Sequence, residues 1–430
     1  MGISTGPSQI CFIIKQSLIL PSLSWFLRVI RKPSETPTAH TYEVDAFRNS
    51  GANSFGPLEF ELDRDSILSD FKKLIPSIWT SSIRLGSVYE QIQYEPLEAL
   101  IALGQKIYFA LNPEVREVIN ASDSIHLYTS DIEIPWEIMH DGIDFVSITH
   151  SFGIGLASRR RISERETQMI GRLSVLLIVD PENNLPKARE ETNKILSLLN
   201  DNIKVDTTIL QGKEATYSAV RSRLAKESFD ILHVAAHTQF KPTKPKESII
   251  FLNDGCLSAG EIYRDIQNYS NNPSEPPWLV FMNSCESAKI LDLTYFEKYG
   301  ELLGLAAAFT TSGALSYIGT SGIINDSYAS EIAVNFYKYL LRGSTIGESL
   351  RKAKDDFRKN HLKDASWSVF KLYGNPNTDL RFSQSSRDLL AEIKGYLKQK
   401  QGSFNVQDCA ADLDVTISEV NDTIYRLKSG

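Results

Sequence analysis

The stretch of sequence that decides the fold runs from Phe229 to Cys285. It begins Phe229-Asp-Ile-Leu-His-Val-Ala-Ala-His237 and ends Trp278-Leu-Val-Phe-Met-Asn-Ser-Cys285. Both ends are short apolar runs, which is typical of the buried strands of a parallel sheet. Each run stops on a residue able to do chemistry, an imidazole after the first and a thiol after the second. Because sites in open α/β sheets form at the carboxyl ends of strands, we expect His237 and Cys285 to meet at one rim of a sheet.

Strands and helices alternate on both sides of this stretch. The apolar patterns predict strands at 173–180, 204–210, 229–235, 278–283, 314–319 and 368–373, the last of which closes the sheet. They predict helices at 187–199, 215–225, 302–311, 327–341 and 346–360. A hairpin of residues 248–252 and the piece around Leu257, with its turn at Asp254-Gly255, is expected beside the sheet. This alternation predicts an α/β fold, a mostly parallel sheet with helices on both faces.

The segment before this region mixes both periodicities. Residues 58–62 alternate with period two, residues 95–111 carry an apolar stripe at helical spacing, and residues 131–136 indicate a strand entering a turn. We therefore predict an N-terminal segment at 1–40, an α+β subdomain at 41–165, the α/β domain at 166–384 and a small helical module at 385–430.

The module at 385–430 resembles a helix-turn-helix over residues 406–427. It carries six Lys or Arg against seven Asp or Glu. A helix that reads DNA would normally offer more positive charge to the phosphates, so this balance favours a module that docks an activating or adaptor protein. DNA binding stays open as the alternative use of the same module.

Composition limits the partners and the compartment. The net charge of −7 over 430 residues disfavours a general nucleic-acid or anionic-membrane binder. The four cysteines, Cys11, Cys256, Cys285 and Cys409, lack the spacing of disulfide pairs or metal ligands. That usage fits a reducing cytoplasm, where a thiolate stays available, and no metal or cofactor is expected. The apolar residues 10–30 are too interrupted for a confident membrane span and predict a buried strand or helix.

Several ordered motifs carry a resemblance to a known family. His-Val-Ala-Ala-His237 and Asn-Ser-Cys285-Glu-Ser are similar to the paired motifs of CHAT domains, caspase-like cysteine peptidases in the clan of caspases, metacaspases and separases. The histidine precedes the cysteine by 48 residues, which is the order and nearly the spacing of the caspase-type signature. Further matches lie at Ile134-Pro-Trp-Glu137 and at 246–248, 257–261 and 370–376. The resemblance covers residues 96–382 and implies a caspase-like α/β fold.

The resemblance also implies roles for three residues. Cys285 would attack a peptide carbonyl, and His237 would take its proton and later give one to the leaving amine. The backbone N–H groups of Cys285 and Thr238 would hold the oxyanion. Relatives usually have glycine where this chain has Thr238, and a β-carbon narrows the backbone angles available to that oxyanion site.

Asn283, two residues before Cys285, is a predicted substrate-binding residue. Metacaspases and paracaspases, which resemble this region and prefer basic residues at the cleavage site, have aspartate at this position. An uncharged amide removes that counter-charge, so specificity for a basic residue becomes less favoured. The pair His233 and His237 has a spacing that serves metals on a helix, whereas this run indicates a strand. We therefore expect His233 to be a hydrogen-bonded structural residue.

Three functions remain in competition at this point. The first is a cysteine endopeptidase that cleaves specific protein partners and, as the resemblance implies, is activated by a partner within a bacterial defence or cell-death module. The second is a catalytically silent caspase-like scaffold that binds proteins. The third is a regulator that binds DNA through its C-terminal module. The presence of both Cys285 and His237 favours the first, while the oligomeric state is left undetermined.

Overall fold

The computed structural model describes residues 24–32, 40–48, 55–84, 96–155, 172–202, 205–267, 276–285, 287, 289, 304–380 and 407. The predicted helical module at 385–430 lies outside these residues apart from Gln407. Of the apolar stretch at 10–30, only the part from Ser24 onward is described. That part forms a strand whose alternate side chains are buried, as the pattern predicted. No helix in the described ranges is both long enough and apolar enough to cross a membrane.

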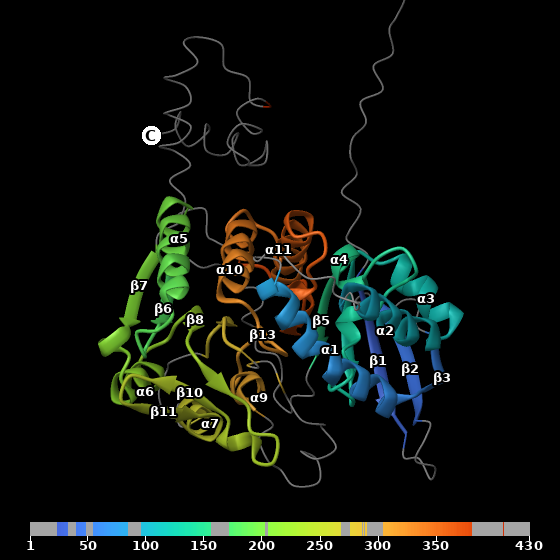
Figure 1. The fold of residues 1–430 in the computed structure, drawn as a ribbon, viewed down its shortest axis with the longest axis horizontal. Coiled ribbons are helices and arrows are strands. Elements are labelled where there is room, and N and C mark those ends of the chain that lie inside the picture. The colour runs from blue at the N-terminus through green and yellow to red at the C-terminus, as the bar shows by residue number, and fades with distance from the viewer. Residues whose placement is uncertain are drawn as a thin grey trace, which may run out of the picture.

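One sheet runs through both the N-terminal subdomain and the α/β domain (Figure 1). Across the sheet the strands follow the order β3 (Phe55–Leu62), β2 (His40–Arg48), β1 (Ser24–Arg31), β4 (Ser124–Thr129), β5 (Ser151–Gly155), β14 (Phe370–Gly374), β13 (Ser316–Thr320), β12 (Leu279–Met282), β8 (Ile231–Ala235), β6 (Leu173–Val179) and β7 (Val205–Gln211). Three neighbouring pairs, β3–β2, β2–β1 and β14–β13, are antiparallel, and the other pairs are parallel. The predicted mostly parallel α/β sheet is confirmed.

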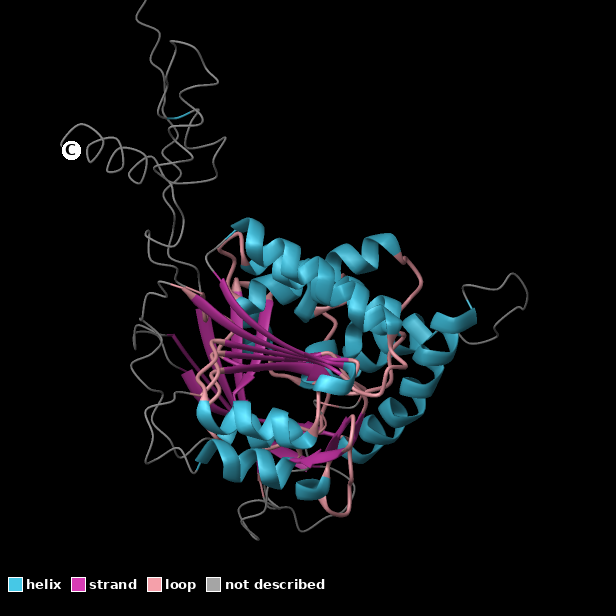
Figure 2. Ribbon diagram, turned by 90° about the vertical axis from the view of Figure 1, so that its left-hand side faces the viewer, coloured by secondary structure: helices cyan, strands magenta, loops and turns pink. Residues whose placement is uncertain are grey.

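Helices cover both faces of the sheet, as the alternation predicted (Figure 2). On the α/β domain, α5 (Pro186–Asn202), α10 (Asp326–Leu340) and α11 (Ile346–Asn360) form one layer, and α6 (Tyr217–Lys226), α7 (Ala259–Gln267) and α9 (Leu305–Thr311) form the other. The N-terminal strands are covered by α1 (Arg64–Arg84), α2 (Pro96–Ala110) and α3 (Pro113–Asn120). Short helices lie at α4 (Val146–Thr149), η1 (Trp136–Ile138), η3 (Gly212–Glu214), η4 (Pro245–Glu247) and η6 (Ser366–Val369).

Side-chain caps begin several of these helices where the sequence carries a short polar residue. Thr216 accepts from the backbone N–H of Ala219 at the start of α6, and Thr345 accepts from Glu348 at the start of α11. The Asn325 side chain likewise accepts from the N–H of Ser327. Such caps satisfy N–H groups that have no partner within the helix, and they fix where the helix starts. For α10, this start lies just after the end of β13.

Two predictions about strands were wrong. The strand at 368–373 forms as β14 but does not close the sheet, because β5 pairs with its other edge and carries the sheet on into the N-terminal strands. Its buried apolar pattern fits an edge or an interior position equally well, so the sequence alone could not decide. Residues 131–136 form a turn and the start of η1 in place of a strand. The Trp136 indole donates to the Asp131 carbonyl, and this bond closes the segment into a turn.

A small three-stranded sheet lies beside the large one. It has the order β11 (Gly255–Ser258), β10 (Ile249–Leu252) and β9 (Thr238–Gln239). The first two strands are the predicted hairpin, with Gly255 paired to Leu252 across the turn. The third strand begins at the residue after His237. The hairpin therefore positions one of the two residues in the proposed chemistry.

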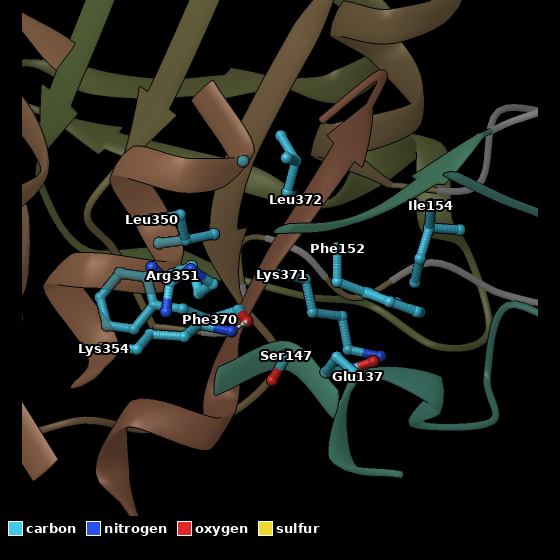
Figure 3. A pocket seen from close by; sticks show the side chains of 11 residues that line it. Glu137, Ser147, Phe152, Ile154, Leu350, Arg351, Lys354, Phe370, Lys371 and Leu372 are labelled. Carbon is cyan, nitrogen blue, oxygen red and sulfur yellow. Dashed lines mark hydrogen bonds and ion pairs between the residues drawn. The ribbon is translucent and has the colours of Figure 1, made fainter. Parts of the chain in front are cut away.

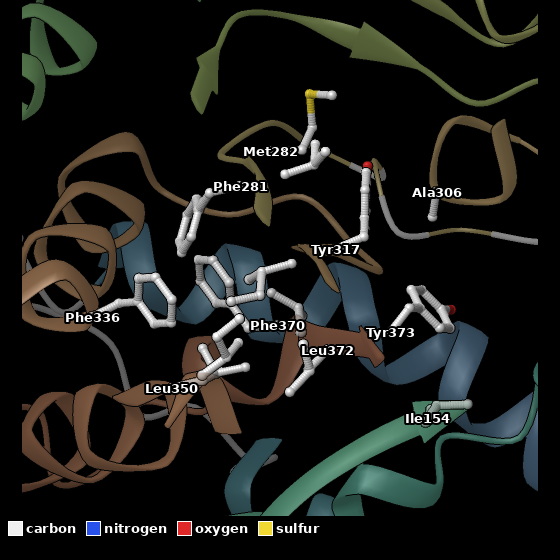
Figure 4. Packing of buried hydrophobic residues seen from close by; sticks show 14 of the residues in the cluster. Ile154, Phe281, Met282, Ala306, Tyr317, Phe336, Leu350, Phe370, Leu372 and Tyr373 are labelled. Atoms are coloured by element: carbon white, nitrogen blue, oxygen red, sulfur yellow. The ribbon is translucent and has the colours of Figure 1, made fainter. Parts of the chain in front are cut away.

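Aromatic and aliphatic side chains from β12, β13, β14, α10 and α11 pack densely around Phe281 (Figure 4). Phe281 on β12 is fully buried, and its ring centroid lies 5.1 Å from that of Phe336 on α10 and 6.3 Å from that of Phe370 on β14. The same ring stacks on His233 at 5.4 Å. Close packing of this kind leaves little freedom to the strand, so it holds the residues that follow β12 in place.

Candidate active site

His237 and Cys285 follow two adjacent strands at the same register. On the parallel pair β8 and β12, His233 lies opposite Phe281 and Val234 lies opposite Met282. This offset of 48 residues also separates His237 from Cys285. The pairing continues one residue past the strand, where the Asn283 N–H donates to the Val234 carbonyl at 2.8 Å. The two segments therefore leave the sheet side by side at one rim.

A direct hydrogen bond joins the two segments beyond the sheet. The Thr238 hydroxyl donates to the backbone carbonyl of Cys285. Cys285 is half-buried and not part of a disulfide, while His237 is exposed. Both side chains are at least partly accessible, so the thiol can meet a substrate and the imidazole can exchange protons with solvent. The arrangement can therefore support a thiol nucleophile with a nearby base.

The backbone N–H of Thr238 points away from the small sheet. Phe251 donates its N–H to the His237 carbonyl at 2.9 Å, which makes this a hydrogen-bonded pair of the antiparallel ladder. Thr238 is the next residue and faces Ile250 as a non-hydrogen-bonded pair, so its N–H lies outside the ladder. Among the described non-glycine residues only Asp180 and Asn183 have positive φ, so Thr238 holds an ordinary strand conformation. A β-carbon at this position is thus accommodated without left-handed backbone.

The residues after β12 are held by hydrogen bonds from β13. The Thr320 hydroxyl donates to the Ser284 carbonyl at 2.8 Å, and the Thr320 N–H donates to the Ser287 hydroxyl at 3.1 Å. The Tyr317 hydroxyl donates to the Ser287 carbonyl at 2.8 Å. These buried hydrogen bonds hold Ser284 and Ser287, which lie on either side of Cys285. They fix its backbone in a region where no regular ladder continues.

A buried polar chain lies behind the two strand ends. Asn283 donates from Nδ2 to Oε2 of Glu191 at 2.7 Å. The other oxygen of Glu191 lies 2.9 Å from Nε2 of His233. On its far side, His233 contacts the Tyr337 hydroxyl through Nδ1 at 3.2 Å. His233 is thus the hydrogen-bonded structural residue that the sequence predicted.

Sequence reasoning missed Glu191. A signal existed, because Glu191 falls on the apolar stripe of its helix at helical spacing from Ala188, Ile195 and Leu198. A carboxylate on the buried face of a helix needs a partner inside the protein. The sequence does not show which partner, because Asn283 and His233 lie far from Glu191 along the chain.

Asp326, at the start of α10, is a second carboxylate that sequence reasoning missed. Its side chain stays open to solvent, yet desolvation by the surrounding chain raises the pKa of Asp326 above its ordinary value. The nearby imidazole of His237 opposes that shift, and the carboxylate of Glu191 adds to it. Asp326 therefore shares an electrostatic neighbourhood with the predicted base. The position follows from the approach of α10 to the sheet rim, which spacing alone does not reveal.

A pocket elsewhere in the protein is lined by charged residues of the family-like motifs (Figure 3). Glu137 and Lys371 are buried and form an ion pair with Nζ and Oε1 3.0 Å apart. Lys354 donates to the Phe370 carbonyl at 2.8 Å, and burial lowers the pKa of Lys354 to about 8. Glu137 and the neighbouring Trp136 are both buried, at 2% and 1% exposure. Among the described residues, no cluster of three or more His, Cys, Asp or Glu could hold a metal ion.

The family model of the CHAT domain matches residues 93–375, well over half of the chain. The chain belongs to the CHAT-domain family. Two structures of the Saccharomyces cerevisiae separase–securin complex resemble this CHAT protein with a TM-score of 0.51 each, at 9% and 8% identity. A structure of the pro- and mature domains of Porphyromonas gingivalis RgpB gives a TM-score of 0.40 at 9% identity, over 65% of this chain and 69% of that one. No curated protein matches the sequence.

The likeness to separase establishes a shared fold. It covers 81% of the CHAT protein but only 30% of the separase chain, so this protein spans less than a third of that relative. A match over 81% of the chain extends beyond residues 166–384, as does the single large sheet. The securin in that complex is a partner of separase.

Proposed function

We propose that this CHAT protein is a cysteine endopeptidase with Cys285 as the nucleophile and His237 as the general base. The observation that carries the proposal is the shared register of β8 and β12, continued by the hydrogen bond from Thr238 to Cys285. A thiol is a weak nucleophile near neutral pH, and an adjacent imidazole provides the activation that it needs. Membership of the CHAT family supports the same assignment.

In the proposed reaction, Sγ of Cys285 bonds to the scissile carbonyl carbon while the thiol proton passes to His237. The resulting imidazolium returns this proton to the amide nitrogen as the C–N bond breaks, which releases the amine and leaves a thioester. Water then attacks the thioester and gives its proton to His237. The C–S bond breaks, the thiolate takes the proton back, and the acid product leaves.

The negative oxygen formed in each attack needs donors already in place. We assign this role to the backbone N–H groups of Cys285 and Thr238. For Thr238, the proposal is supported by the pairing of β9, which leaves its N–H outside the small sheet. The ordinary φ of this residue supports it as well, because the donor does not depend on glycine at this position.

The substrate in this proposal is a specific protein partner, and Asn283 binds the residue at the cleavage site. Activation by an adaptor protein that docks on residues 385–430, within a cytoplasmic bacterial defence or cell-death module, is part of the proposal. The boundaries at 40, 165 and 384 also remain predictions. No observation on the described residues favours the silent scaffold or the DNA-binding regulator over the peptidase.

The decisive experiment combines labelling with cleavage. The protein is treated with iodoacetamide, the labelled cysteine is mapped by mass spectrometry, and cleavage is measured on a peptide library derived from a proteome. We expect rapid labelling at Cys285 and loss of cleavage in both Cys285→Ala and His237→Ala. Cys256→Ala is the matched control, because Cys256 is likewise outside any disulfide but lies exposed on β11, the outer strand of the small sheet. Cleavage that survives either substitution in a folded sample would rule out the dyad, and a folded protein with an unreactive Cys285 would favour the scaffold.

A further inference from the structure

One buried carboxylate contacts both strands that carry the proposed dyad. Glu191, only 2% exposed, accepts from Asn283 at 2.7 Å and lies 2.9 Å from Nε2 of His233. Asn283 stands two residues before Cys285, and His233 stands four residues before His237. The helix α5 thus contacts a residue of β8 and the residue after β12 through a single side chain. Removal of that side chain would leave both strand ends without their shared polar partner.

The carboxylate also determines the orientation of the Asn283 amide. An ionised carboxylate only accepts hydrogen bonds, so the NH₂ group of Asn283 must face Glu191. Oδ1 of Asn283 therefore does not take part in the hydrogen bond to Glu191. Oδ1 is buried and has no hydrogen-bond partner among the described residues. A buried acceptor without a partner costs free energy, which a substrate donor at this position would recover.

We infer that Glu191 is a positioning residue with two effects. It holds the ends of β8 and β12 at the register that brings His237 and Cys285 together. It also orients Asn283 so that Oδ1 accepts a hydrogen bond from the substrate side chain bound beside the nucleophile. The inference rests on the proposed function and refines its substrate class: the side chain at the cleavage site carries a hydrogen-bond donor, whether charged or neutral.

A swap of amide and carboxylate tests the contact. In Glu191→Gln, an amide faces the Asn283 amide, and Asn283 must turn round to restore a bond. In Asn283→Asp, two carboxylates face each other where the present contact is 2.7 Å, and both cannot stay ionised without strong repulsion. The double variant restores a complementary pair, because the new amide on α5 donates to the new carboxylate while its oxygen still faces His233.

We expect each single variant to slow iodoacetamide labelling of Cys285 and cleavage by about tenfold or more, and the double variant to return to within about threefold of the wild type. Glu190→Gln is the matched control, since Glu190 is exposed on the same helix and pairs with Lys187. Its rates should equal those of the wild type. Thermal melts of all variants establish that the rates are compared between folded proteins.

Cleavage of fluorogenic peptides separates positioning from simple stabilisation. The wild type should prefer glutamine, lysine or arginine over norleucine at the cleavage site. The double variant should shift further toward arginine and lysine, because its negative charge now lies at position 283. A purely structural contact would recover stability with no change in this preference.

Two outcomes would overturn the inference. The first is a folded double variant no faster than the slower single variant, and the second is Asn283→Asp with wild-type rates and preference. Failure of the proposed function looks different. In that case no peptide is cut by any variant, while the labelling rates of Cys285 still show whether Glu191 and Asn283 act as a pair.

Discussion

The hydroxyl of Thr238 donates a hydrogen bond to the backbone carbonyl of Cys285, which joins the segment after β8 to the segment after β12. Thr238, which stands where relatives usually have glycine, therefore links the segment of the proposed base, His237, to the proposed nucleophile, Cys285. A glycine could not make this contact, because it has no side chain. In this protein, the Thr238 hydroxyl adds a hydrogen bond at the rim, and the backbone of Thr238 stays outside the left-handed region.

Thr238→Val should slow cleavage by about fivefold to tenfold, because it removes one hydrogen bond worth about 1 kcal/mol while keeping the shape of the side chain. Thr238→Ser keeps the hydroxyl and should retain most of the activity. The measurement is the cleavage rate of a peptide substrate, with the melting temperature as the check on folding. Equal rates in Thr238→Val and wild type would show that the bond does not contribute to the reaction.

Asp326→Asn should slow cleavage by about threefold to tenfold, because the carboxylate near His237 stabilises the imidazolium formed when Cys285 loses its proton. Asp326 is open to solvent, so the difference between variant and wild type should shrink as salt is added. Glu331→Gln, further along α10 and paired with His361, is the control. A rate loss that is independent of salt would point to a structural role at the start of α10.

Lys354→Met should stabilise the protein at pH 7 by up to about 3 kcal/mol, because burial lowers the pKa of Lys354 to about 8 from 10.5 and so penalises the charged form in the fold. A lysine with a lowered folded pKa destabilises the fold fully below pH 8, and this penalty disappears as the pH rises from 8 toward 10.5. The gain in unfolding free energy from Lys354→Met should therefore be largest near pH 7 and smallest above pH 10.

Lys371→Met is the opposite case in the same pocket, because Lys371 pairs directly with the buried carboxylate of Glu137. Its loss leaves that charge without a partner and should destabilise the protein by about 3–5 kcal/mol. Denaturant unfolding at several pH values measures both variants. If both lysine variants shift stability in the same direction, the charge assignment of this pocket is wrong.

Truncation after Gln384 should leave the large sheet intact, because all eleven of its strands lie before that residue. We expect the truncated protein to keep a Cys285 that reacts with iodoacetamide and to lose affinity for its natural protein partner. Labelling kinetics and a binding assay with the partner make the comparison. If the truncated chain cleaves the partner at the full rate, the module at 385–430 has another function. Sequence-specific DNA binding would then be measured.

The sequence by itself determined the core of the fold and the candidate dyad. Apolar runs in parallel strands are long enough to be seen locally, and a polar residue that ends such a run lies at the rim whichever strand is its neighbour. On these grounds the sequence predicted the positions of His237 and Cys285, the hairpin at Asp254-Gly255 and the helix at 346–360. Each depends only on a local pattern plus the geometry of parallel sheets.

The tertiary structure alone decided which segments became neighbours. The place of β14 between β13 and β5 depends on hydrogen bonds to both edges, and its buried pattern is the same at an edge or in the interior. Likewise Glu191 meets Asn283, 92 residues away in the chain, only because the fold places α5 against this part of the sheet. Contacts between distant residues arise from packing, and a local pattern contains no information on the partner that packing supplies.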